Sequence, residues 1–418
     1  MSLAVLIFEL GLLLCLRALG MTNVPGVLAA ALIIVYSVAY IIGLERKPAC
    51  RKYAAALIAG YAFRMVLLLF DLYGSDIYIL PNSGADTEMF YQNALIVAQG
   101  GTTIRGAFCE YMGYFFRYFG TSRLFAQFLL TLCSVVSMEC AAKIFNLLDL
   151  DDGRTNTALW MICLLPNFAI LSVIFLRESL VTMFISLSLL YFIKWFKHGQ
   201  DRYFILAIIL TFCGARFHSG SIAVPVGYVM ARMLYDRREN KLRLRFKNIF
   251  AASVLLLIGV FFLNRYGDSF LGKFSRLEDL SDVANVNTMG GSNYSQYVGN
   301  SSNPLNMIIF TIPRMVFFMF SPMPWMIRGL SDIIAFCFSS CFYIYTTYRV
   351  IIYLRSKRTE NRKLVIVIFI VALCAAFVFG WGVSNSGTAC RHRDKVTIVW
   401  GVLLGLTMMP KERRISTW

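Results

Sequence analysis

The sequence is poor in charged residues. Only 15% of its 418 residues are charged, whereas 58% are hydrophobic and the mean hydropathy is +0.65. The apolar residues come in repeated runs of about 20 that are apolar on every side, which is the length a helix needs to cross a bilayer. This composition excludes the soluble fold classes and predicts an all-α fold, a polytopic transmembrane helical bundle.

Nucleotide-binding and metal-binding motifs are also missing from the sequence. It has no P-loop, no glycine-rich dinucleotide fingerprint, no CxxC pair and no cluster of its 3 histidines. Most of the 11 cysteines fall in apolar runs and are expected to be small buried hydrophobes, although Cys109 and Cys390 lie outside these runs and could pair. We therefore predict no cofactor, and we expect any activated group to arrive on the substrate.

Basic residues exceed acidic ones by 40 to 23, and the formal net charge is +17. Most of them gather in short segments between apolar runs, which indicates membrane topology rather than nucleic-acid binding. By the positive-inside rule these segments face the cytoplasm, together with both chain termini. The five basic segments are residues 46–52, 194–202, 237–247, 355–363 and 411–414.

The apolar runs predict about twelve spans. The first is expected to be a span rather than a signal peptide, because it lacks a basic n-region and a cleavage site. Residues 111–119 and 307–325 are too short or too rich in proline to cross, so we predict interfacial or re-entrant segments there. The predicted spans are residues 3–20, 25–43, 54–73, 123–147, 156–174, 179–195, 203–214, 219–234, 249–264, 330–354, 364–381 and 396–409.

These spans suggest three parts of the chain. Residues 1–53 form an N-terminal transmembrane hairpin, and residues 54–235 form a transmembrane core with an acidic outer loop at 74–120. Residues 236–418 form a C-terminal part with an outer loop at 265–305.

Six arginines are left on the outer face, where the positive-inside rule predicts few basic residues. An unpaired charge near hydrocarbon costs about 3 kcal/mol or more, so such residues are expected to be paired or functional. Each could separately reach lipid headgroups or a local acid. Together they favour a shared anion site, because the guanidinium fork matches phosphate. The six are Arg105, Arg177, Arg216, Arg314, Arg391 and Arg393.

The densest outer charge lies in GVSNSGTACRHRDK, residues 382–395. Arg391 and Arg393 are predicted to bind a lipid diphosphate where its charge develops, with His392 as a second candidate. Asp394 could instead pair with one of these arginines, which leaves a structural role open for it.

An acidic motif stands in the outer loop, in the stretch GADTEMFYQNA of residues 84–94. Asp86 could be the N-cap of the helix that follows. The functional interpretation makes Asp86 a general base that takes a proton from a sugar hydroxyl, with Glu88 in support. The two carboxylates could also bind a divalent cation weakly.

Two further outer turns carry charge. In LLPNFAILSVIFLRESL, Pro166 breaks a span, and Arg177 with Glu178 forms either a self-compensating pair or part of the pocket. The span before GARFHSGS is short, which places Arg216 and His218 below the outer surface. His218 is either a structural hydrogen-bonding residue or a diphosphate contact and proton shuttle.

Arg314 lies in IPRMVFFMFSPMPW among aromatic residues and prolines. These aromatics are typical of an interfacial belt, and could alternatively form a platform for a sugar ring.

The motifs carry a resemblance to known families. Residues 123–195 resemble the helical module of polyprenyl-dependent membrane glycosyltransferases of the GT-C type, and GADTEMFYQNA is similar to their acidic motif. PRMVFFMFSPMPW and WGVSNSGTACRHRDK resemble bacterial repeat-unit polymerases of capsule and O-antigen clusters. The resemblance implies an enzyme of polysaccharide biosynthesis in the bacterial cytoplasmic membrane, which joins undecaprenyl diphosphate-linked oligosaccharides on the outer face.

We therefore expect a glycosyltransferase that polymerises lipid-linked repeat units. Its expected partners are the undecaprenyl-linked oligosaccharides, membrane lipid, and flippase and chain-length regulator proteins. A transferase of single sugars from a polyprenyl-phosphate donor is the nearest alternative. A flippase or exporter of the lipid-linked glycan is the alternative from another class.

Overall fold

A computed structural model describes residues 25–46, 51–150, 152–236, 239–243, 246, 250, 293–298, 309–356 and 361–408. These residues are almost entirely helical. The strands among them are the two-residue β1 (Tyr235–Asp236) and β2 (Lys241–Leu242), which pair antiparallel. The predicted spans 3–20 and 249–264, the chain termini and most of the loop 265–305 lie outside the described residues.

The structure confirms that the described residues form a helical bundle with several apolar helices that could span a membrane. Five helical segments are long and apolar enough to cross a membrane by length and composition. They are α4 (Ala54–Tyr73), α7 (Arg123–Leu147), α10 (Glu178–His198), α20 (Arg362–Trp381) and the continuous segment Leu330–Arg355. That last segment consists of α18 (Leu330–Ile334), a π-helical stretch (Ala335–Ser340) and α19 (Cys341–Arg355).

A sixth candidate span is broken, as Pro166 predicts. Helices α8 (Asp152–Cys163) and α9 (Pro166–Val173) meet at a bend of 51°. Arg64 of α4 reaches this bend, where its Nη1 donates to the carbonyl oxygen of Cys163 over 2.7 Å and its Nε donates to Ser134 Oγ over 2.9 Å. The buried Arg64 therefore joins the broken span to α4 and α7.

Other predicted spans are helical, but their crossing stays a prediction. They are α2 (Pro25–Arg46), α11 (Asp201–Ala215), α12 (Ala223–Leu234) and α22 (Thr397–Thr407). The two segments predicted to be interfacial or re-entrant are also short helices. These are α6 (Ala107–Phe119) and α17 (Thr311–Phe320), the second followed by a 3-10 turn (Pro324–Met326).

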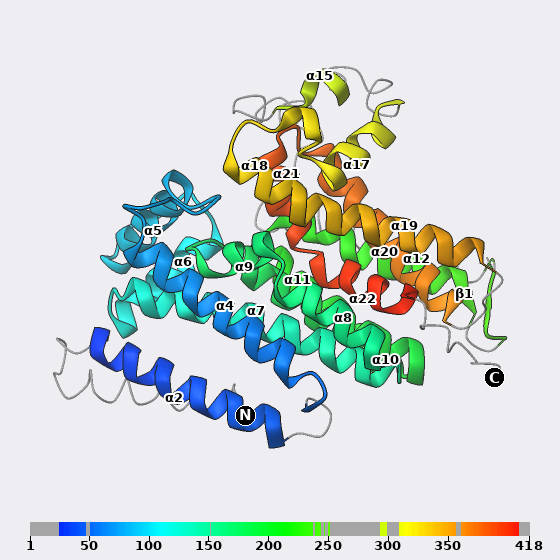
Figure 1. The fold of residues 1–418 in the computed structure, drawn as a ribbon, viewed down its shortest axis with the longest axis horizontal. Helices are drawn as coiled ribbons and strands as arrows, with labels where there is room; N and C mark the ends of the chain where they lie inside the picture. Colours follow the sequence, from blue (N-terminus) through cyan, green and yellow to red (C-terminus); the bar gives the residue numbers. More distant parts are fainter. Residues whose placement is uncertain are drawn as a thin grey trace, which may run out of the picture.

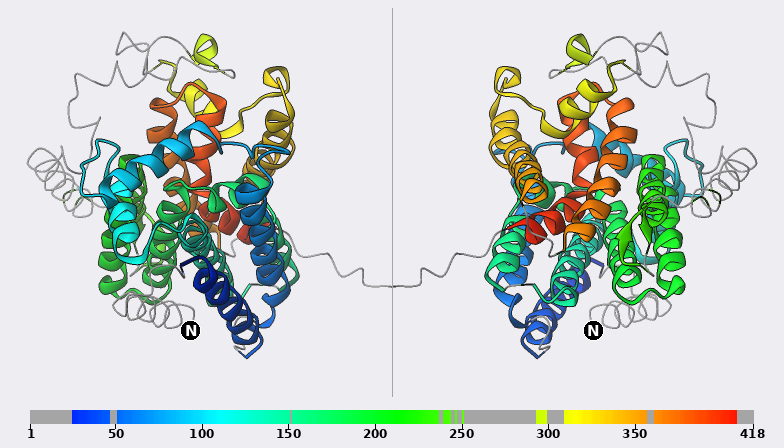
Figure 2. Two further views of the ribbon diagram at one scale, coloured as in Figure 1. Left: turned by 90° about the vertical axis from the view of Figure 1, so that its left-hand side faces the viewer. Right: turned by 90° about the vertical axis from the view of Figure 1, so that its right-hand side faces the viewer.

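Helix α22 occupies the interior of the bundle. All of its residues are buried, and it packs against α8, α19 and α20 (Figures 1 and 2). Gly401 allows the close approach, since a Cβ there would lie 2.3 Å from Ile162 Cδ1.

The acidic loop forms a helical hairpin at one end of the bundle. It consists of α5 (Ala85–Ala98) and α6, which lie at the end of α4 and α7 opposite to β1 (Figure 1). The basic C-terminal turn of α10 lies at the other end, so the positive-inside rule predicts that the hairpin end is the outer one, and this orientation stays a prediction. A short helix near the C-terminus, α21 (Ser386–Asp394), reaches the same end and brings its charges to the hairpin.

Candidate functional site

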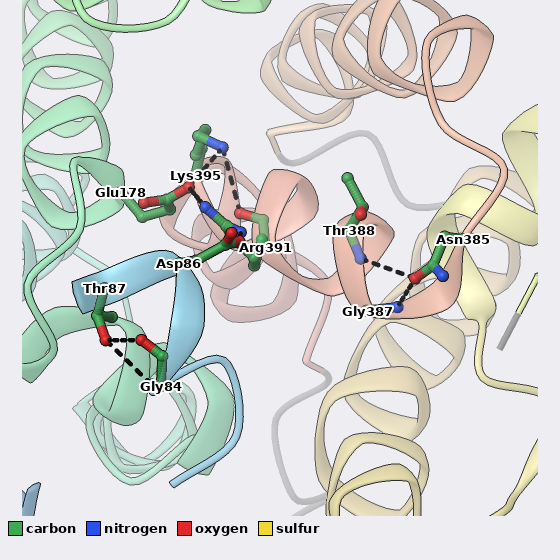
Figure 3. Close-up of polar contacts among 9 residues, drawn as sticks. All are labelled: Gly84, Asp86, Thr87, Glu178, Asn385, Gly387, Thr388, Arg391 and Lys395. Atoms are coloured by element: carbon green, nitrogen blue, oxygen red, sulfur yellow. Dashed lines mark hydrogen bonds and ion pairs between the residues drawn. The ribbon is translucent and has the colours of Figure 1, made fainter. Parts of the chain in front are cut away.

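The site begins with α21, which carries most of the predicted cationic motif. Asn385 caps this helix, because its Oδ1 accepts from the backbone N–H groups of Gly387 at 2.9 Å and Thr388 at 3.3 Å (Figure 3). The capped helix then places Arg391 and Lys395, four residues apart, on one side.

Arg391 joins two carboxylates from distant parts of the chain. Its Nη1 donates to Asp86 Oδ2 over 2.5 Å, and its Nη2 donates to Glu178 Oε1 over 3.1 Å (Figure 3). Lys395 Nζ lies 3.6 Å from the same Glu178 oxygen. We call these four residues the ion cluster. Asp86 and Arg391, predicted from motifs 305 residues apart, are brought into direct contact.

The ion cluster leads from the surface into the protein. The Asp86 side chain is 52% exposed and that of Arg391 is 15% exposed, whereas Glu178 and Lys395 are buried. Glu178 is the first residue of α10, where the positive end of the helix dipole favours a carboxylate. The exposed end of the cluster is therefore open to a ligand, and its buried end is neutralised by protein groups.

The acidic helix α5 presents Asp86 without using it as a cap. The N-cap is Gly84, whose N–H donates to Thr87 Oγ1 over 3.0 Å and whose carbonyl accepts from the same hydroxyl over 2.8 Å. The alternative interpretation of Asp86 as the N-cap is therefore wrong. Its side chain is bonded to Arg391 instead.

Arg177 lies beside the ion cluster and is the N-cap residue of α10. Its guanidinium carbon lies 5.7 Å from the centre of the Phe90 ring, and its buried Nε has no hydrogen-bond partner in the part of the chain that is described. Burial lowers the pKa of Arg177, while the neighbouring Glu178 opposes that shift. A guanidinium in such surroundings has donors to offer an anion.

Two histidines lie behind Arg391 and Lys395. The rings of His218 and His392 are 4.6 Å apart in an edge-to-face arrangement, and both contact the ring of Phe379. Burial lowers the pKa of both histidines well below the usual value, and the charge of Lys395 adds to this. This shift favours the neutral form of both rings, which line the cluster.

Lys395 is the deepest cation of the cluster. Burial lowers its pKa to about 7, while Glu178 acts in the opposite direction. When Lys395 is charged, three cationic side chains (Arg177, Arg391 and Lys395) face two carboxylates, which leaves an excess of positive charge for an anionic ligand.

Arg393 was predicted to share the anion with Arg391, but it faces the protein interior. All three of its nitrogens are hydrogen-bonded to protein groups, and its side chain is buried. Its partners are the Ser339 and Ser340 hydroxyls, the Met319 and Ser321 carbonyls and Cys390 Sγ. This arrangement suits an anchor for α21 rather than a ligand-binding group.

The neighbouring Asp394 is also directed inward. It accepts hydrogen bonds from the Tyr343 hydroxyl at 3.3 Å and from Thr397 Oγ1 at 3.4 Å. Burial raises its pKa to about 6, against the influence of Arg393.

The other predicted residues occupy different surroundings. Arg216 pairs with Glu110 of α6 at 3.4 Å, and Arg314 is buried and donates to the Trp381 carbonyl over 3.2 Å. Arg105 is exposed in the loop before α6. The pairing that Cys109 and Cys390 left open is not formed, since both are free, buried thiols.

Glu88 does not join Asp86 at the ion cluster. It pairs with Arg123 at 2.6 Å, a residue that the sequence suggested only as the start of a span. Within the described residues no group of three or more His, Cys, Asp or Glu side chains could hold a metal ion. Each of the two loop carboxylates instead has its own arginine.

Sequence reasoning missed Lys395 and Arg123 as parts of this region. A helical spacing of four from Arg391 is a signal that could have selected Lys395. No local pattern indicates the pairing of Arg123 with Glu88, because it depends on how α5 folds back over α7.

Comparison with known protein families, with curated proteins and with solved structures finds no match to this chain. The site's own chemistry therefore has to support any functional assignment.

Proposed function

We propose that this chain is a membrane glycosyltransferase that polymerises undecaprenyl diphosphate-linked repeat units on the outer face of the bacterial cytoplasmic membrane. One observation carries the proposal. The half-exposed Asp86 is held by Arg391 at the entrance of a cationic cluster, beside Arg177, whose buried Nε has no hydrogen-bond partner among the described residues.

The reaction needs two kinds of group, and the site offers both. As the bond between the donor sugar and its lipid diphosphate breaks, negative charge develops on the diphosphate, which Arg177 and Arg391 can stabilise. The acceptor hydroxyl attacks the sugar carbon and gives its proton to the Asp86 carboxylate. The products are a new glycosidic bond and a free lipid diphosphate, so no nucleotide is consumed.

The Asp86–Arg391 pair suggests an order of events. In the structure, Arg391 is hydrogen-bonded to one of the two Asp86 carboxylate oxygens, Oδ2. A diphosphate bound to Arg391 competes for these donors and leaves that oxygen free for the acceptor hydroxyl. Glu178 stays paired with Arg391 and Lys395, and it keeps the Arg391 guanidinium in place.

The position of the intramembrane charge supports an enzyme over a flippase. A flippase is expected to have polar residues along a path through the bundle. Among the described residues, Arg64 is a fully buried charge within a predicted span and away from the outer end, and it donates to Gly60 O, Cys163 O and Ser134 Oγ. These contacts give Arg64 a role in packing rather than in a glycan pathway.

The test replaces Asp86 with Asn and Arg177 with Ala in a strain that lacks the native gene, with lipid-linked glycans as the readout. We expect each change to reduce polymer by at least about 100-fold, because it removes a base or a charge-stabilising group. Single repeat units should accumulate on the outer face. Arg202→Ala, at the start of α11 and at the opposite end of the bundle, is the matched control and should leave polymer unchanged.

Normal polymer in Asp86→Asn would contradict the proposal. Repeat units that accumulate inside the cell would instead indicate a flippase. Loss of single-sugar additions with normal polymer length would indicate the transferase alternative.

A further inference from the structure

The outer end of α7 is hydrogen-bonded to the elements that lead to the carboxylates and to Arg177. The contact point is Gln127, which is fully buried. Its Nε2 donates to Asp71 Oδ2 over 2.7 Å and to the Val173 carbonyl over 2.6 Å, while its Oε1 accepts from Arg123 Nε over 3.0 Å. One amide thus joins α4 and α9 to α7 and also bonds to Arg123 of its own helix, and the bonds use both of its N–H groups.

Each of these bonds leads to a part of the site. Val173 ends α9, and the short stretch after it carries Arg177 and Glu178. Asp71 lies in the last turn of α4, immediately before the loop that leads to α5. Arg123 donates to Glu88 over 2.6 Å, and Glu88 lies in the first turn of α5 with Asp86.

The orientation of the Gln127 amide is fixed by its partners. A flipped amide would place its oxygen against the Asp71 carboxylate and the Val173 carbonyl, and its NH₂ group against the Arg123 guanidinium. That arrangement would lose all three hydrogen bonds in a buried place, where unsatisfied polar groups cost about 1–3 kcal/mol each. Arg123 is held further by the ring of Tyr91, which lies 5.1 Å from its guanidinium carbon.

We propose that Gln127 and Arg123 are positioning residues that set the distance between Asp86 and the Arg177–Glu178 segment. In this arrangement Glu88 holds α5 on α7 and takes no part in proton transfer. The effect of this positioning on sugar transfer rests on the function proposed above. The positioning of α5 itself does not depend on that function.

The role of Glu88 is tested with a matched pair of variants in a transfer assay. Glu88→Gln keeps an oxygen for Arg123 and removes the charge, and Glu88→Ala removes both. If Glu88 is a tether, Glu88→Gln should keep transfer within about threefold of the parent. Glu88→Ala should lower kcat at least tenfold and leave KM nearly unchanged, because the base is displaced while Arg177 and Arg391 remain. Equal loss in both variants would make Glu88 a reacting group and overturn its assignment as a tether.

The positioning itself is tested without any transfer assay. Amide hydrogen exchange is measured over residues 85–98 in purified protein carrying Gln127→Leu or Arg123→Ala. We expect exchange to become at least about tenfold faster there, because the bonds that fix α5 are lost. Gln296→Leu, at an exposed glutamine, is the control and should leave these amides unchanged.

Unchanged exchange in both variants would overturn the inference, even where transfer is reduced. Conversely, an active Asp86→Asn protein would refute the proposed function and leave the exchange result to decide the positioning. The two failures are therefore distinguishable.

Discussion

At the residue scale, the ion cluster combines groups that would be unstable if they were buried alone. Glu178 is buried, yet it faces Arg391 at 3.1 Å and Lys395 at 3.6 Å. Removing one member leaves a buried charge without its partner, and the resulting loss of folding free energy is larger than the net stabilisation that the pair contributes. The outermost pair is different, because the exposed Asp86 can exchange Arg391 for water or ligand.

Lys395 predicts a pH dependence. Because burial lowers its pKa to about 7 against the opposing effect of Glu178, Lys395 loses its proton as the pH rises through neutrality. Binding of an anionic donor should then weaken above about pH 7, and we expect Lys395→Met to show weaker binding with no transition in this range. The charged and titratable groups that face Lys395 are Glu178, Arg177, Arg391, His392 and His218.

The measurement is the pH profile of the KM for the lipid-linked donor between about pH 5 and pH 9. If a transition near neutrality persists in Lys395→Met, the transition belongs to another titratable group. The histidines are poor candidates, because their pKa values lie well below the usual one.

At the element scale, the site depends on a helical hairpin that packs through one small residue. Helices α5 and α6 cross at Gly113, where a Cβ would lie 2.4 Å from Val97 Cβ and 2.8 Å from the Ala94 carbonyl. Since Asp86 and Glu88 begin α5, a shift of the hairpin displaces both carboxylates together. The packing of α6 is thereby linked to the geometry of the ion cluster.

Gly113→Val should force the two helices apart. We expect a fall in thermal stability equivalent to about 1–3 kcal/mol, as for other overpacked contacts, and a marked loss of transfer activity. The measurement is the unfolding temperature in detergent, together with polymer analysis. Gly329→Val, where a Cβ meets nothing within 4 Å, is the control. Parent-like stability and activity in Gly113→Val would contradict the tight crossing.

At the scale of the whole molecule, the predicted mechanism requires one orientation of the protein in the membrane. The loop that carries Arg105 and the ion cluster must face away from the cytoplasm, and the turn between α10 and α11 must face it. Helix α10 connects these ends, with Glu178 at its first residue and Lys197 and His198 in its last turn.

Cysteine substitutions at Arg105 and Arg202 test this orientation. A membrane-impermeant maleimide added to intact cells should label the first position and not the second, beyond the labelling of the parent chain. Opening the membrane should make position 202 reactive. Labelling of both positions from the same side would contradict the topology on which the common pocket depends.

The sequence by itself determined the class of the molecule and the candidates for its site. Apolar runs of helical length predict membrane helices because lipid leaves no alternative for the backbone polar groups. Pro166 predicts the broken span because it has no N–H to continue the helix. Charge on the outer face selected Asp86, Glu178 and Arg391, which the structure brings together, because isolated charges near hydrocarbon are costly.

Only the tertiary structure decided which of these charges share a site. Neighbours in sequence separate, since Arg391 reaches Asp86 while Arg393 turns inward to Ser339, and Asp86 and Glu88 bind different arginines. The physical reason is that a helix turns about 100° per residue, so adjacent side chains point to different surroundings. Their partners come from other elements, 35 to 305 residues away in the sequence, whose packing no local pattern specifies.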